Sequence, residues 1–392
     1  MFTFDLLIFI IIGLIVIALT EKLKTIIPRS LFFLIAGVIL STFGIVDPTG
    51  SVEIIAGIAI VFLLFTAELP HGNVVHFFKA VVRNIRISII AAIGPWVGAF
   101  TFSTFFGWSF EEAIILGAVF TATALAFTLG VLRSLQLERT DAAKSAVTAS
   151  ATDSVIAGMI GMLTSIAVGS SIAHSSSETS PLIEILLIFL FFAFLYLLHS
   201  IFVKFRPLRF LPPHPLVLLL VGGIIIYIGG YFFGVHYAIA ALLAGVLLHE
   251  EIFSSKDAKL FSTAAEQIGV ASRYIGPFFF IFLGLHLSLR DVIDNPLIIG
   301  ASIGLFLSVA TLQFATASFA GAWRGLNHRN ATVLGFAMLP RDIVAIVVLE
   351  MNMEFIQDDM IIPVVVMTIF FLNIATALGL AWCKKHYWHS EN

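Results

Sequence analysis

Apolar runs of about 20 residues recur along the whole chain and are separated by short polar breaks. A helix of that length crosses a hydrocarbon core about 30 Å thick, because it rises about 1.5 Å per residue. The pattern predicts thirteen membrane-spanning helices, near residues 4–20, 30–44, 52–69, 87–106, 112–132, 145–168, 181–203, 215–233, 236–249, 274–289, 295–322, 330–350 and 361–383. We therefore expect an all-α polytopic membrane protein, with one transmembrane domain over residues 1–392.

Composition supports a membrane protein. Hydrophobic residues make up 59% of the chain and charged residues 11%, whereas soluble domains carry about 25% charged residues. The run from Phe4 to Thr20 is preceded by no basic residue, so we interpret it as a retained helix and not as a signal peptide. A net charge of -3 indicates no nucleic-acid partner. We expect an integral protein of a prokaryotic cytoplasmic (inner) membrane, surrounded by lipid.

The basic residues predict the orientation of the chain. Of the 21 lysines and arginines, 19 lie in alternate loops or the carboxyl-terminal tail, and the exceptions are Arg290 and Arg341. Cytoplasmic loops retain positive charge. The amino terminus is therefore expected outside and the carboxyl terminus inside.

Two short motifs recur in the second half of the chain. LIAGVIL at 34–40 returns as LLAGVLL at 242–248, and FLLFTAEL at 62–69 resembles FIFLGLHL at 280–287. The matched helices are seven apart, and since seven is odd the two copies are inverted. We expect a first repeat near 4–168, a linker helix near 181–203 and a second repeat near 215–383. Inverted repeats are typical of secondary transporters.

Asp153 is the strongest candidate for a functional residue. It follows Lys144 by nine residues, which places it about 13 Å along the sixth helix, near the bilayer midplane. Thr121 and Thr123 lie at similar depth in the fifth helix, and Pro340 interrupts the twelfth. These features predict crossing discontinuous helices whose freed carbonyls and hydroxyls surround a carboxylate. The alternative is a buried acid that neighbouring hydroxyls satisfy.

Other polar residues inside the spans have more than one interpretation. Thr152 could bind an ion or join helices. Arg341 could neutralise helix ends and brace an acid such as Glu68 or Asp342, or it could tune Asp153 directly; we favour bracing.

The chain resembles the cation:proton antiporter-2 family of sodium/proton exchangers. The resemblance runs from about Leu31 to Leu378 and rests on TAT at 121–123, LLAGVLL, PFFFIFLGLHLSL and GFAMLPRDIVAIVV. It implies a homodimer in which an ion-binding bundle, residues 87–168 and 295–383, moves against the remaining scaffold. It also implies that Asp153 binds a monovalent cation and a proton in turn, with Na⁺ favoured over K⁺ or Li⁺, and that the protein is a transporter, not an enzyme, with no cofactor.

The chain departs from the family pattern in three places, two of which bear on the stoichiometry. Many members carry two adjacent acids where this chain has Thr152 and Asp153, and charge-moving members carry a lysine near Gln313. Both differences favour electroneutral exchange of one cation for one proton. The third is the PRDI sequence at 340–343, where Asp342 stands one position before the family's glutamate, which leaves the partner of Arg341 open.

Three rival functions remain at this point. A potassium-efflux channel of the same fold usually carries a nucleotide-binding domain, which the sequence lacks. An organic-anion symporter fits Asp153 poorly, because an acid suits a cation. An intramembrane enzyme would need a second mid-span acid or a metal-ligand cluster, which the sequence does not offer.

Overall fold

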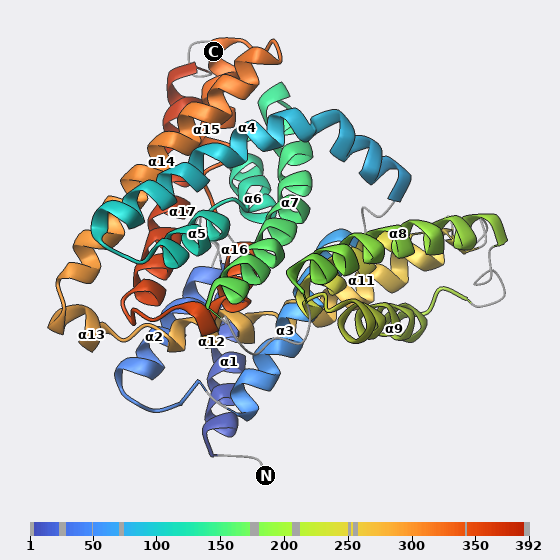
Figure 1. Cartoon of the computed structure of the whole chain (residues 1–392), viewed down its shortest axis with the longest axis horizontal. Helices are drawn as coiled ribbons and strands as arrows, with labels where there is room; N and C mark the ends of the chain where they lie inside the picture. Colours follow the sequence, from blue (N-terminus) through green and yellow to red (C-terminus); the bar gives the residue numbers. More distant parts are fainter. Residues whose placement is uncertain are drawn as a thin grey trace. The chain divides into compact units, whose positions relative to one another are not determined.

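The computed structural model describes residues 4–22, 29–48, 50–69, 74–172, 180–205, 212–249, 252–253, 258–341 and 343–387 (Figure 1), and these ranges contain no β-strand. The first helices are α1 (Phe4–Lys22), α2 (Arg29–Thr42), α3 (Ser51–Glu68), α4 (Val74–Phe106), α5 (Phe110–Val119), α6 (Leu125–Ser134), α7 (Asp141–Ile172), α8 (Pro181–Phe205) and α9 (Pro215–Phe233). They are followed by α10 (Tyr237–Leu247), α11 (Ala258–Ile275), α12 (Pro277–Leu285), α13 (Leu289–Asp294), α14 (Leu297–Trp323), α15 (His328–Ala337), α16 (Ile343–Glu350), the 3₁₀ turn η5 (Met353–Phe355) and α17 (Ile361–Tyr387).

The described residues confirm an all-helical membrane protein. Six candidate spans are long and apolar enough to cross a bilayer, at Ser88–Phe106, Pro181–Phe205, Pro215–Phe233, Lys259–Leu285, Leu297–Trp323 and Ile361–Tyr387. Shorter apolar helices include Phe4–Thr20 and Ser51–Thr66. The count of thirteen spans and the orientation of the termini stay predictions.

Three helix boundaries differ from those expected. α4 begins at Val74 and α7 at Asp141, so their basic residues are helical and not in loops. The span expected at 274–289 is the second part of the longer candidate Lys259–Leu285. Its first part, α11, is amphipathic: Phe261 and Ile268 are buried, while Glu266 is exposed. Sequence interpretation took the polar positions of α11 for a loop, but they occupy one face of a helix.

The chain divides into two compact units. The first comprises Met1–Leu23, Phe32–Lys79 and Ser170–Leu285, and the second comprises Lys24–Leu31, Ala80–Gly169 and His286–Asn392.

The first unit packs around α10, in which every residue from Ala238 to Leu247 is buried. Glycines of the repeated motifs permit its closest helix contacts. A Cβ on Gly245 of α10 would clash with the Phe65 carbonyl of α3. A Cβ on Gly37 of α2 would clash with the Ile281 carbonyl of α12, and one on Gly284 would clash with the Leu34 carbonyl. Each motif of one half therefore packs on the other motif of the opposite half.

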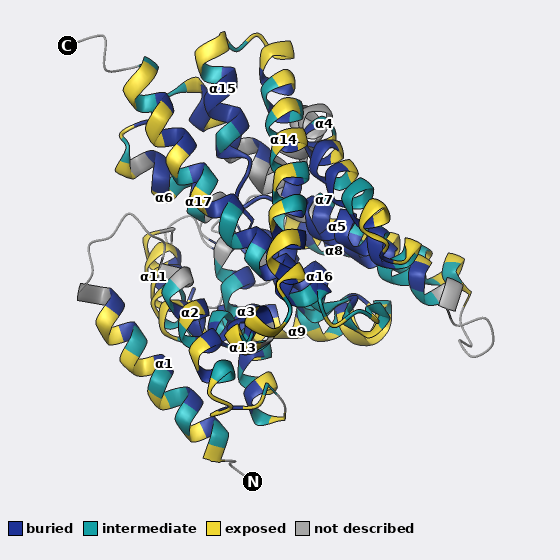
Figure 2. Cartoon of the chain, turned by 90° about the vertical axis from the view of Figure 1, so that its left-hand side faces the viewer, coloured by how far each residue is buried: buried dark blue, intermediate teal, exposed yellow. Residues whose placement is uncertain are grey.

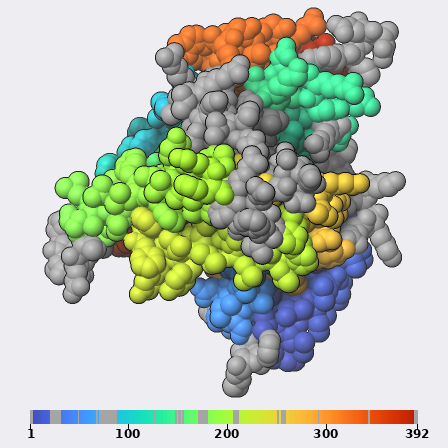
Figure 3. Space-filling model, turned by 90° about the vertical axis from the view of Figure 1, so that its right-hand side faces the viewer, coloured from blue at the N-terminus to red at the C-terminus, as the bar shows by residue number. Residues whose placement is uncertain are grey.

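Apolar side chains also cover exposed faces of the first unit, as expected for helices in lipid. α8 and α9 lie side by side, and Figure 3 shows them in green and yellow-green on one face. Leu220, Ile224 and Tyr227 of α9 are among the exposed apolar side chains. α1 alternates exposed and covered residues along its length (Figure 2).

The second unit contains the predicted ion-binding residues that the structure describes. α14 packs on α15 and α17, and α16 packs on α5. A Cβ on Gly94 or Gly98 of α4 would clash with the backbone of α14, and the Ser308 hydroxyl of α14 donates to the Gly98 carbonyl at 2.8 Å. These close contacts hold α4 against α14.

Candidate functional site

Two helical stretches of the second unit are interrupted, as the prediction of discontinuous helices requires. α5 ends at Val119 and α6 begins at Leu125, so residues 120–124 are not helical. α15 ends at Ala337 and α16 begins at Ile343, with Pro340 between them. Proline lacks the N–H that would continue the helical hydrogen bonding.

The two interruptions contact each other. The Ala124 backbone N–H donates to the Pro340 carbonyl at 2.9 Å, and the Thr128 hydroxyl donates to the Ala337 carbonyl at 2.7 Å. Each bond satisfies a carbonyl that the broken helix leaves without an intrahelical partner. The broken helices therefore cross and stabilise each other's free ends.

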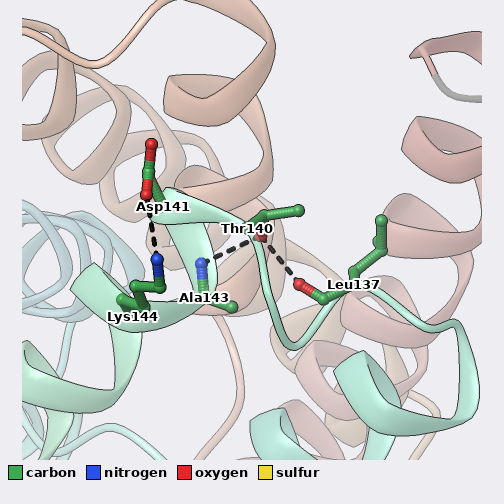
Figure 4. Close-up of polar contacts among 5 residues, drawn as sticks. All are labelled: Leu137, Thr140, Asp141, Ala143 and Lys144. Atoms are coloured by element: carbon green, nitrogen blue, oxygen red, sulfur yellow. Dashed lines mark hydrogen bonds and ion pairs between the residues drawn. The ribbon is translucent and has the colours of Figure 1, made fainter.

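α7 carries Asp153 into this crossing. Its start is fixed by Thr140, whose hydroxyl accepts from the Ala143 N–H at 3.2 Å and donates to the Leu137 carbonyl at 2.8 Å (Figure 4). The nearby Lys144–Asp141 ion pair, at 3.3 Å, is exposed and contributes little.

Asp153 is 2% exposed, and it lies beside the first interruption. The Thr123 hydroxyl donates to its Oδ2 atom at 3.2 Å, and the buried Ser88 hydroxyl interacts with the same carboxyl group. Its Oδ1 atom is buried and has no hydrogen-bond partner among the described residues. A buried carboxylate oxygen without a partner is costly unless a proton or a cation satisfies it.

Arg341 binds the carbonyls of the second interruption, directly after the end of α15. It is 1% exposed, and its Nη1 atom donates to the carbonyls of Met338, Leu339 and Pro340 at 2.9, 3.1 and 3.1 Å. A positive charge is favourable at the carboxyl end of a helix because the helix dipole is negative there. An electrostatic interaction also joins Arg341 to Asp153. These contacts are compatible with neutralising the helix end and with tuning Asp153, so the role of Arg341 stays a prediction.

Two neutral amides also contact Arg341. Its Nη2 atom donates to Gln313 Oε1 at 2.9 Å, and Gln313 is 1% exposed in α14. Asn373 of α17 accepts from the Arg341 backbone N–H and donates to its carbonyl, both at 3.2 Å. Gln313 therefore contacts the arginine, and α17 holds the backbone of the second interruption.

The remaining predicted site residues fall into two groups. Thr121 is 2% exposed and lies in the first interruption, but its hydroxyl donates to the Ala118 carbonyl at 2.6 Å. It also lines an apolar cavity of about 320 Å³ between α4 and α7. Asp342 and the side chains of Thr152 and Glu68 lie outside the described residues, so the bracing of an acid by Arg341 stays a prediction.

Sequence interpretation missed Glu112, a 4% exposed acid in the first turn of α5. Its carboxylate accepts a hydrogen bond from the backbone N–H of the neighbouring Ser109. It also accepts from the backbone N–H groups of Gln357 and Asp358, which lie far later in the chain. The Ser109-to-Glu112 spacing is the capping-box signature, which could have revealed the local half of this arrangement.

A family model described as "Sodium/hydrogen exchanger, transmembrane" matches residues 6–383. The chain belongs to the sodium/hydrogen exchanger family. It is therefore an integral membrane transporter that exchanges a cation for protons, and it is not an enzyme. The narrower assignment to the cation:proton antiporter-2 branch stays a prediction. No curated protein sequence matches the chain significantly.

Solved structures agree with the family assignment at the level of the fold. A structure of the sodium proton antiporter MjNhaP1 from Methanocaldococcus jannaschii at pH 8 matches with a TM-score of 0.66 and 17% identity, covering 96% of this chain and 95% of that one. An electron-microscopy structure of MjNhaP1 matches with a TM-score of 0.65 and 18% identity, covering 98% and 97%. The chain thus has the fold of this antiporter over nearly its whole length.

Proposed function

We propose that this protein exchanges a monovalent cation for H⁺ by letting the two compete for Asp153. The observation that carries the proposal is the environment of that carboxyl group. One oxygen accepts from Thr123, and the other is buried without a hydrogen-bond partner among the described residues. Hydroxyl, carboxylate and freed carbonyl oxygens at interrupted helices are suitable ligands for a small hard cation. Na⁺ is the first candidate, with K⁺ and Li⁺ as alternatives.

Competition follows from the cost of burying charge. An ionised carboxylate in a low-dielectric site needs a compensating partner, and protonation or cation binding each supplies one. A proton on Asp153 removes the charge that attracts the cation, so the two occupants exclude each other. If the site opens alternately to the two sides, this exclusion is sufficient for exchange.

We propose that the exchange is electroneutral. Gln313 is neutral, so it cannot release a proton when the cation binds. Arg341 stays charged because a guanidinium does not deprotonate in proteins, and it already donates to the carbonyls of the second interruption. Asp153 then carries one proton in one direction and one monovalent cation in the other.

We also propose an elevator-type movement in a homodimer, as the family resemblance implies. The second unit would carry the bound ion and the first would serve as scaffold and dimer contact. The contacts of Asp153, Thr123, Arg341 and Gln313 given above all join residues of the second unit. Such a site can move as one body without breaking its own hydrogen bonds.

The test is collapse of an imposed pH gradient in proteoliposomes, with the membrane potential clamped by an ionophore. Na⁺, K⁺ or Li⁺ is added to wild type, Asp153→Asn and the control Asp141→Asn, an exposed acid of the same helix. We expect cation-dependent collapse for wild type and the control, and none for Asp153→Asn. A response that survives in Asp153→Asn, or no response of wild type to any cation, would refute the proposal and favour a channel or an organic-anion symporter.

A further inference from the structure

Glu112 joins the first interrupted span to a distant connection of the chain. Its Oε2 atom accepts from the Ser109 backbone N–H at 2.9 Å and from the Ser109 hydroxyl at 2.8 Å. Its Oε1 atom accepts from the backbone N–H groups of Gln357 and Asp358, both at 3.0 Å. One buried carboxylate therefore binds four donors, two at the start of α5 and two before α17.

A second bond runs beside the first. The Trp108 indole N–H donates to Asp358 Oδ2 at 3.1 Å, and the other carboxylate oxygen of Asp358 accepts from the Met360 N–H at 2.8 Å. Trp108 is 7% exposed. We call Trp108, Glu112 and Asp358 the α5–α17 latch. Its two cross-links connect residues almost 250 positions apart in the sequence.

Each of the two helices that the latch connects is linked at its other part to one interruption of the ion site. α5 has ten residues, so it is about 15 Å long. Its far end leads into the interruption where Thr123 donates to Asp153. α17 carries Asn373, which holds the backbone of Arg341 in the other interruption. The latch thus connects α5 and α17 on one side, and the crossing of the interrupted helices connects them on the other.

The chemistry of the latch requires a carboxylate and not only a helix cap. The cap needs only local bonds: the Ser109 hydroxyl accepts from the Glu112 N–H at 3.2 Å, and Glu112 Oε2 accepts from the Ser109 N–H. The cross-link to residues 357 and 358 needs further acceptors, and an ionised carboxylate has two oxygens that only accept. An amide would turn one of them into an NH₂ donor facing other donors. Hydrogen bonds to a charged group are also stronger than neutral ones.

We propose that Glu112 is a positioning residue for cation binding. It holds α5 in place along its axis, so that the Thr123 hydroxyl stays at the Asp153 carboxylate, and it thereby sets the affinity for the cation. This inference rests on the proposed function at Asp153. Glu112 itself does not contact the ion; it acts through α5.

The test compares Glu112→Gln with Glu111→Gln, which removes the same charge from the same helical turn. Cation binding is measured by the rise in melting temperature with Na⁺, K⁺ or Li⁺ concentration, which yields an apparent Kd. The KM and maximal rate are measured in proteoliposomes. We expect Glu112→Gln to raise Kd and KM about tenfold, since bonds to a charged group are lost, while the maximal rate changes less than about twofold and Glu111→Gln resembles wild type.

A second variant addresses misfolding. Trp108→Phe removes one cross-link and keeps an aromatic ring, so we expect a smaller increase in Kd in a folded protein. The proposal is wrong if Glu112→Gln lowers the maximal rate at unchanged Kd, or if it matches Glu111→Gln, or if Trp108→Phe leaves Kd unchanged. If wild type itself binds no cation, the proposed function fails together with this inference. If wild type binds the cation and Glu112→Gln has the same Kd and KM as wild type, only the role of the latch is refuted.

Discussion

The hydrogen bond from Thr123 to Asp153 makes a quantitative prediction for Thr123→Val. Valine has nearly the same shape as threonine but lacks the hydroxyl, so the change removes the donor at 3.2 Å from Oδ2. A hydrogen bond to a charged group contributes about 1.5–3 kcal/mol. Because this bond is long, the lower end of that range applies, which corresponds to about a tenfold change in an equilibrium constant.

The direction of the effect follows from the charge state. A hydroxyl donor stabilises the ionised carboxylate more than the protonated one. The cation binds the ionised form, so its affinity falls when the hydroxyl is removed. We therefore expect the KM for the transported cation to rise about tenfold at a fixed pH near neutrality.

The assay is cation-dependent collapse of a pH gradient in proteoliposomes, measured over a range of cation concentrations. The matched control is Thr121→Val, which removes a hydroxyl that bonds the Ala118 carbonyl and not Asp153. We expect the control to change KM less than about threefold, because it loses a neutral bond. Equal KM values for Thr123→Val and wild type, or a larger effect from Thr121→Val, would refute the assignment of Thr123 to the site.

Three further predictions concern Arg341, charge transport and helix packing. Arg341→Met removes a donor from the carbonyls of Met338, Leu339 and Pro340, and we expect a loss of about 1–3 kcal/mol in stability because buried acceptors lose hydrogen bonds, measured as a lower melting temperature. Arg341→Lys should lose less, and equal melting temperatures of Arg341→Met and wild type would contradict a stabilising role of these bonds. Wild-type exchange should generate no transient current on a solid-supported membrane when the cation is added, and a transient current that scales with cation concentration would contradict electroneutral exchange. Gly284→Ala should lower the melting temperature through a clash with the Leu34 carbonyl, whereas Gly223→Ala, which meets nothing within 4 Å, should not.

Several features of the site could be predicted from sequence because the membrane imposes them locally. An acid inside an apolar run is costly in hydrocarbon, which marked Asp153 as a candidate wherever its helix packed. Pro340 interrupts a helix through its own missing N–H, and the TAT sequence at 121–123 lies in a similar apolar run. Length and hydropathy established the helical membrane architecture, since only paired backbone groups are tolerated in lipid.

Other features depended on contacts between distant residues, which no local pattern contains. One example is the hydrogen bond from the Ala124 N–H to the Pro340 carbonyl. It forms only because the two interrupted helical stretches cross. α11 was mistaken for a loop because its polar face is evident only once its buried face is packed.

The contrast is clearest at Glu112. Its spacing from Ser109 predicts a helix cap, since capping depends on a few neighbouring residues. Its bonds to Gln357 and Asp358 depend on where the chain returns after α16. The sequence by itself determined which polar residues need a partner inside the membrane, because the free-energy cost of burying an unpaired polar group depends on the residue and its depth. Only the tertiary structure decided which partners satisfy them, because those partners are brought together by helix packing.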